Sequence, residues 1–306
     1  MSAIPPERPP AVQGAPPRRG VIHDLGYRPY DGTRLGPGAI ALALFSTGLR
    51  NVFGLGRSGK SKVLPWTLLA LNLLPAVIVV GVMVMVKLDS LPVGFARYAT
   101  TTQILVSIFV AAQAPILFSH DQRHGSIVLY LARPLRPATY ALVRLASLWA
   151  AVLVYLVVPV LILYVGALLA ELPVWEQTVD ALQALLLVFL LAGMLAGLAA
   201  VISSWSVRRG FAVVATIMVL LLGNGIVAVI QGIAWDQGQD RIGEVAGLFS
   251  PYSLYRGLME LFDLPQATIT PPEGAAMLTA YVVVTLATIL VCIGLLVWRF
   301  KKVADR

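Results

Sequence analysis

Residues 145–170 read LASLWAAVLVYLVVPVLILYVGALLA, an apolar run without Asp, Glu, Lys or Arg. A helix needs about 20 apolar residues to cross roughly 30 Å of hydrocarbon, and one charge at its centre would cost about 2.5–3.5 kcal/mol. Five similar charge-free runs accompany this one. The six predicted spans are Val63–Val86, Thr102–Phe118, Leu145–Ala170, Gln183–Ser203, Phe211–Ala234 and Ala275–Trp298. The sequence therefore predicts an all-α polytopic membrane protein with six transmembrane helices, and excludes a closed barrel, whose strands alternate and are half as long.

The composition points the same way. Of the 306 residues, 58% are hydrophobic and 12% are charged, and that charged share is about half the usual one for a soluble domain. Such a chain lacks the polar surface that a soluble fold of this size needs, which excludes an ordinary cytosolic enzyme. The single cysteine, Cys292, excludes a disulfide framework and a multi-cysteine metal site.

Basic residues are distributed unevenly among the loops that these spans define. Nineteen of the 23 Lys and Arg lie in residues 1–62, in the loops after the second and fourth spans, or in the C-terminal tail. Ten of the 15 acidic residues lie on the other side. The positive-inside rule then places both termini in the cytoplasm. The net charge of +8 follows from this orientation, and no nucleic-acid partner is expected.

The segments before the first span are basic. Residues 1–20 hold six prolines and three arginines and lack an apolar core, so we interpret them as a disordered tail and not as a signal peptide. Residues 21–62 form a cytosolic lead-in to the six-span domain, which covers residues 63–302. Within the lead-in, Ala39–Phe53 is predicted to be a helix, either amphipathic in the membrane interface or simply adjacent to the membrane.

The longest outer loop, residues 235–274, also contains a predicted helix. Serine is a good N-cap and proline is favoured at the first helical position, so Ser250 and Pro251 mark a helix start. The apolar residues that would share one face of this short helix are Tyr255, Leu258, Met259 and Phe262. We expect that face to pack on the membrane or on the outer ends of the spans.

Residues 54–61, GLGRSGKS, match the phosphate-binding P-loop pattern. That chemistry requires a buried strand before the loop and a helix after it, so that backbone N–H groups surround the phosphate. Here a predicted interfacial helix precedes the match and a membrane span follows it. We therefore interpret Gly54–Ser61 as a fortuitous match in a basic turn that contacts lipid headgroups. We also expect that the chain is not itself an enzyme.

Residues 120–124, HDQRH, resemble the H-E-x-x-H zinc motif. In that motif two histidines share a helix face and the acid acts as general base. Aspartate is one methylene shorter than glutamate, and the sequence offers His23 as its only other histidine. We interpret His120 and His124 as a polar cap at the end of the second span, with a membrane metalloprotease as an alternative; no metal or other bound cofactor is expected.

Glycines and amides inside the spans allow two interpretations each. The small-xxx-small pair Gly193 and Gly197 predicts close helix packing, within the chain or at a dimer interface. Amides in spans either line a transport path or hydrogen-bond neighbouring helices, and the second interpretation is favoured here. These amides are Asn72, Gln103, Gln113, Asn224 and Gln231. No acidic residue lies at mid-membrane, which argues against the alternative of an ion-gradient-driven carrier.

The loop after the second span reads FSHDQRHGSIVLYLARPLRPATYALVR over residues 118–144. Its apolar stretch, Ile127–Leu131, is too short to cross a membrane. A short helix that lies flat and docks on another protein surface explains these residues better than a plain turn does. Basic residues then lead into the third span.

This loop resembles the acid-x-x-x-Gly-Ser/Thr…Pro stretch in the permease subunits of type-2 ATP-binding-cassette (ABC) exporters. The matching positions are Asp121, Gly125, Ser126 and Pro134, although the family often has glutamate where Asp121 stands. The lead-in Val21–Gly36 and the Gly54–Pro65 string also resemble the N-terminal segments of actinobacterial-type members. The Ser250-Pro251-Tyr252 string is similar to the Pro-containing outer helix that precedes the last span in this family.

The resemblance implies a function and partners. Two permease subunits, identical or paralogous, would assemble in the bacterial inner membrane with two ABC ATPase subunits that bind ATP and Mg²⁺. The residues implied to form the coupling helix that seats on the ATPase are Asp121, Arg123, Gly125, Ser126, Arg133, Pro134 and Arg136. The expected function is ATP-driven export, and the substrate is not implied.

Overall fold

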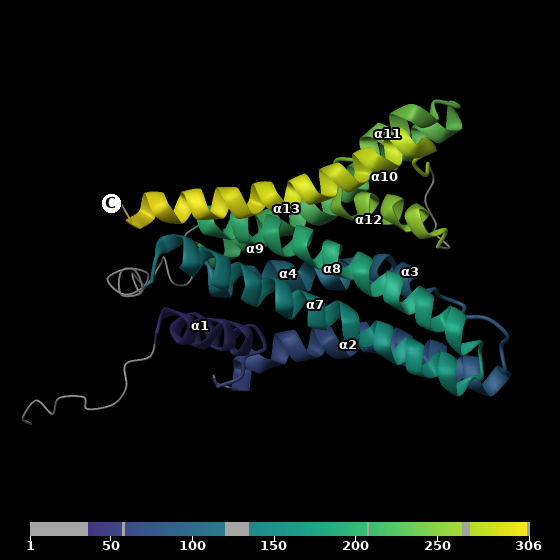
Figure 1. Cartoon of the computed structure of the whole chain (residues 1–306), viewed down its shortest axis with the longest axis horizontal. Coiled ribbons are helices and arrows are strands. Elements are labelled where there is room, and N and C mark those ends of the chain that lie inside the picture. The colour runs from purple at the N-terminus through teal and green to yellow at the C-terminus, as the bar shows by residue number, and fades with distance from the viewer. Residues whose placement is uncertain (1–35, 57–58, 120–134, 207, 265–269, 305–306) are drawn as a thin grey trace, which may run out of the picture. The chain divides into compact units, whose positions relative to one another are not determined.

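The computed structural model describes residues 36–56, 59–119, 135–206, 208–264 and 270–304. The helices in these ranges are α1 (Pro37–Val52), α2 (Gly59–Val86), α3 (Phe95–Thr101), α4 (Gln103–Leu117), α7 (Pro137–Leu169), α8 (Val174–Trp205), α9 (Arg209–Ile217), the π-helix η1 (Met218–Leu222), α10 (Gly223–Asp236), α11 (Asp240–Gly247), α12 (Pro251–Met259), the 3₁₀-helix η2 (Glu260–Phe262) and α13 (Gly274–Ala304). The described part of the chain contains no strand (Figure 1).

Within the described residues, five helices are long and apolar enough to cross a membrane. They are α2, α7, α8, the continuous stretch Arg209–Asp236, and α13. The pair α3–α4 makes a sixth candidate span if its two halves count as one. The prediction of an all-helical chain is thus confirmed for the described residues, and the five or six candidate spans agree with a multi-pass membrane protein. Four predicted runs lie within one of these elements, and Thr102–Phe118 and Leu145–Ala170 each extend one residue past a helix end.

The second predicted span differs from a single straight helix. Its helix begins earlier, at Phe95, and bends by 67° at Thr102. The hydroxyls of Thr100 and Thr101 donate to the carbonyl of Arg97 at 2.8 and 3.1 Å, and that of Thr102 donates to Tyr98 at 3.1 Å. Hydroxyls that bond back to the preceding turn bend helices, which gives the break a local cause.

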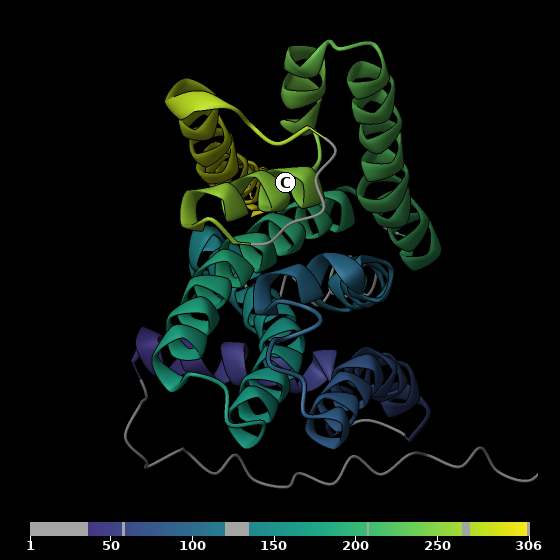
Figure 2. The same cartoon turned by 90° about the vertical axis from the view of Figure 1, so that its right-hand side faces the viewer.

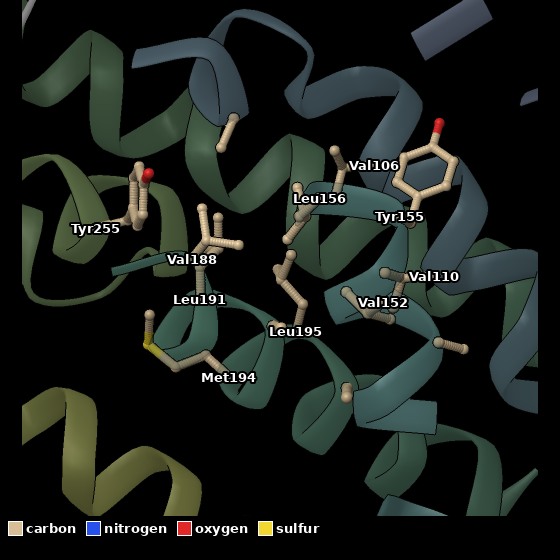
Figure 3. Packing of buried hydrophobic residues seen from close by; sticks show 14 of the residues in the cluster. Val106, Val110, Val152, Tyr155, Leu156, Val188, Leu191, Met194, Leu195 and Tyr255 are labelled. Atoms are coloured by element: carbon tan, nitrogen blue, oxygen red, sulfur yellow. The ribbon is translucent and has the colours of Figure 1, made fainter. Parts of the chain in front are cut away.

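α7 and α8 form the centre of the bundle. In α8, 61% of the most apolar window is buried, against 17% in the peripheral α2. Figure 3 shows Val152 and Leu156 of α7 beside Val188 and Leu195 of α8, with Val106 of α4 close by. Lipid tails are as apolar as these side chains, so close van der Waals packing stabilises the arrangement more than the hydrophobic effect does.

The C-terminal end of α13 is fixed by aromatic and cationic contacts. Phe300 packs edge-on against Tyr140 of α7, with 5.3 Å between ring centroids. Arg299 lies over the ring of Trp205 at 6.0 Å, and Lys302 lies over Trp298 at 5.4 Å. Such aromatic–cation contacts are typical of a membrane–water interface.

Candidate functional site

α12, which lies between α11 and α13 in the chain, is at the end of the bundle away from the C-terminus (Figure 1), and this end faces the viewer in Figure 2. Ser250 caps it by accepting a hydrogen bond from the Ser253 N–H at 3.4 Å, and Pro251 occupies the first turn. Tyr255 is buried and donates to the carbonyl of Ala96 in α3 at 2.7 Å, and burial raises the pKa of its hydroxyl. The helix start predicted at Ser250 is present, and the helix packs on the spans.

A group of polar side chains joins α12 to the neighbouring spans, and we call it the α12 polar cluster. Asn224 of α10 is at its centre. The Asn224 Oδ1 accepts from Ser250 Oγ at 2.9 Å and from Arg256 Nη2 at 3.3 Å, while its Nδ2 donates to Gln103 Oε1 at 3.4 Å. The other members are Ser107, Gln231, Tyr252 and Ser253.

Two irregular helices place the central amides. Gln103 directly follows the break at Thr102, and Asn224 lies just after the π-helix Met218–Leu222. A π-helical turn inserts an extra residue and is frequent at functional sites. The cluster therefore forms where two candidate spans both depart from regular α-helix.

Tyr252 bonds α12 to the second half of the bent pair. Its hydroxyl donates to the Gln103 carbonyl at 3.0 Å and lies 2.7 Å from Ser107 Oγ. Because the single Tyr252 proton is used on the carbonyl, Ser107 donates to Tyr252. Burial raises the pKa of the Tyr252 hydroxyl, so it stays protonated near neutral pH.

α11 closes the other side of the cluster. The Gln231 Nε2 donates to Ser253 Oγ and to the carbonyl of Gly243, each at 3.2 Å. Tyr281 of α13 donates to the carbonyl of Glu244 at 2.8 Å. Every one of these groups is a neutral amide, hydroxyl or carbonyl.

Arg256 is the cation of the α12 polar cluster. The side chain is half-buried, and its Nε is buried without a hydrogen-bond partner. Its only hydrogen bond in the described part of the chain is the one to Asn224. Burial lowers the pKa of the guanidinium, but arginine keeps its charge at physiological pH. Glu260, one turn further along, makes no ion pair with it.

The cluster is suited to binding and not to covalent chemistry. It contains amides, hydroxyls and a guanidinium, none of which pairs with a base in the way an activated nucleophile does. Within the described ranges, no group of three or more His, Cys, Asp or Glu side chains could hold a metal ion.

Most residues of the implied coupling helix lie outside the described residues: Asp121, Arg123, Gly125, Ser126, Arg133 and Pro134. His120 and His124 also lie outside them. Arg136 is described; it is exposed and is the N-cap of α7, followed by Pro137.

The structure brings three of the five predicted amides together. Gln103, Asn224 and Gln231 belong to the α12 polar cluster. Asn72 lies apart, buried, with its Nδ2 donating to the Tyr155 carbonyl at 3.2 Å. Gln113 is buried, and neither amide atom has a partner in the described part of the chain. Four of the five thus bond to neighbouring elements.

Gly193 and Gly197 both face other helices of the same chain. A Cβ at Gly193 would lie 2.7 Å from the Trp149 ring of α7, and one at Gly197 would lie 2.9 Å from Cys292 Cβ of α13. The pair therefore lets α8 approach both neighbours closely.

Within the P-loop match, residues 54–56 lie between α1 and α2, residues 59–61 begin α2, and residues 57–58 lie outside the described residues. Gly54 and Gly56 have φ values of +69° and +80°, which favour glycine. A helix, and not a strand, precedes the turn.

Sequence reasoning missed the importance of Arg256, Ser250 and Tyr252 to this site. In the sequence Arg256 is one of the four basic residues outside the cytoplasmic segments. The available signal was its place in a short predicted helix whose other residues are mostly apolar.

Comparison with known proteins adds no identification. No protein-family model matches the chain, and no curated protein is similar to it.

Proposed function

We propose that this protein is the membrane-spanning permease subunit of a type-2 ABC exporter. The observation that carries the proposal is the helix order: an α1 before the first span, a broken second span, and the short helices α11 and α12 between the last two. Of these features, α12 before the last span is the one that the sequence resemblance implies, and the others are compatible with it. With α3–α4 counted as one crossing there are six candidate spans, and this even number supports the proposal that both termini lie on one side of the membrane, the cytoplasmic side.

In this proposal two copies, or this chain and a paralogue, assemble in the bacterial inner membrane with two ATPase subunits. The chain itself holds no ATP; the ATP and Mg²⁺ are bound by the partner. Residues 121–136 contact the ATPase, and ATP-driven closure of the two ATPases moves them. The motor can bias the permease only by binding its two states with different affinity.

Two substitutions at the implied contact, one that reverses a charge and one that disrupts a helix, test the proposal. Asp121→Lys and Gly125→Pro should leave membrane insertion intact and reduce co-purification of the ATPase encoded beside this gene by about tenfold, together with ATP turnover. The matched control is Asp236→Lys, which reverses an exposed charge at the far end of α10 and should change neither.

Three results would contradict the proposal. The first is full ATPase association and turnover in both variants. The second is transport in vesicles driven by an ion gradient without any ATPase, as a carrier would give. The third is one zinc per chain lost with an activity in His124→Ala, as a metalloprotease would give.

A further inference from the structure

The charge balance of the α12 polar cluster is incomplete. Arg256 offers five N–H donors, and one of them is bonded, to the Asn224 Oδ1 at 3.3 Å. That oxygen already accepts from Ser250 at 2.9 Å. The Arg256 Nε remains buried and without a partner. The cluster thus has an excess of donors and a positive charge that no described carboxylate neutralises.

Arg256 differs from the other basic residues at this end of the bundle. Lys87, Arg97 and Arg241 are exposed to the surroundings, where water or lipid headgroups solvate them. Arg256 is half-buried against Asn224 and Tyr281, and burial lowers the pKa of its guanidinium. A partly desolvated, unpaired charge is costly unless an opposite charge joins it.

The missing group must accept hydrogen bonds and carry negative charge. A guanidinium binds carboxylate and phosphate oxygens through two parallel N–H bonds. The Asn224 Oδ1, which accepts from both Ser250 and Arg256, holds the guanidinium in place, and the remaining Arg256 N–H groups are the donors open to an added group. An oxyanion fits this combination of donors better than a cation or an apolar group does.

We propose that Arg256, oriented by Asn224 and through it by Ser250, forms a subsite for the carboxylate or phosphate group of the molecule that this permease moves. The assignment of that molecule as transported cargo rests on the proposed function. The presence of an anion subsite does not, because it follows from the contacts of Arg256.

The test uses the full-length permease in phosphatidylcholine nanodiscs, without the ATPase. Two probes are titrated separately, inorganic phosphate in solution and phosphatidylglycerol in the bilayer, and the shift of the thermal unfolding midpoint gives an apparent affinity. We expect at least one probe to stabilise the wild type. A response to phosphate identifies a soluble anion as the ligand source, and a response to phosphatidylglycerol alone identifies a lipid headgroup.

Two variants and a control make the test specific. Arg256→Gln should weaken the response about tenfold or more, since a hydrogen bond to a charged group contributes that much. Arg241→Gln removes an exposed arginine of α11 and should keep the wild-type response. Asn224→Asp places a carboxylate beside the guanidinium; it should raise stability without added anion and abolish the response.

The inference is wrong if neither probe stabilises the wild type or if Arg256→Gln responds like the wild type. It is also wrong if the anion-induced shift of the unfolding midpoint falls as much in Arg241→Gln as in Arg256→Gln. Should Arg256→Gln fail to fold, a full anion response in Asn224→Asp overturns the inference by itself. Absence of any ATPase association in the wild type would refute the exporter function while leaving the anion response in place, so the two proposals fail separately.

Discussion

Among the glycines that the structure describes, Gly247 at the end of α11 would bring a Cβ nearest to another atom. A Cβ there would meet the Tyr281 hydroxyl and lie 2.9 Å from Ser253 Oγ and 3.1 Å from Gln231 Nε2. Overpacking a well-filled site costs about 1–3 kcal/mol. Gly247→Ala should therefore lower the unfolding midpoint in detergent. Gly232→Ala, where nothing lies within 4 Å, should leave it unchanged or raise it; equal effects of both would contradict this packing.

The residues of the α12 polar cluster could be predicted from the sequence only in part. The polar residues inside spans are visible in the sequence because hydrocarbon disfavours them. Their partners are not, since Asn224 and Gln103 are 121 positions apart and meet only after the bundle has formed. In the sequence Arg256 resembles the other basic residues of the outer loops, because its burial depends on how the helices pack.

At the scale of helices, α8 depends on its two small residues. Trp149, against which Gly193 packs, cannot move away easily, because its ring lies 4.8 Å from that of Phe189 and its Nε1 donates to the Phe189 carbonyl at 3.1 Å. Gly193→Ala should destabilise the protein by about 1–3 kcal/mol, measured as a lower unfolding midpoint. Gly81→Ala in α2, with open space around it, is the matched control and should show no loss.

Element boundaries illustrate a different limit of sequence reasoning. The apolar runs located the helices well, because a membrane span must satisfy its own backbone and must be long. Arg97 hid the first half of the second span, since a search for charge-free runs stops there. The bend at Thr102 and the π-helix depend on hydroxyl bonding and on contacts with α12, which hydropathy does not report.

For the whole molecule, orientation can be tested by labelling. Cys292, the only cysteine in the sequence, is buried, so the wild type should not react with an impermeant maleimide. Ser90→Cys, between α2 and α3, should be labelled in intact cells, whereas Lys301→Cys, near the C-terminus, should be labelled only after permeabilisation. The reverse pattern would mean that the chain is inserted the other way round.

The π-helix has a consequence for the entire fifth span. The π-helix ends at Leu222, and Asn224, two residues further along, is hydrogen-bonded to Ser250, Gln103 and Arg256. These bonds keep the extra residue of the π-helix in place. If these hydrogen bonds were lost, the π-helical turn would convert to a regular α-helix. Every later side chain of α10 would then rotate by about 100° around the helix axis. Val229 and Ile233, which are now exposed, would then turn inward, and buried residues of α10 would turn outward. The Asn224 amide therefore determines which face of this helix contacts lipid.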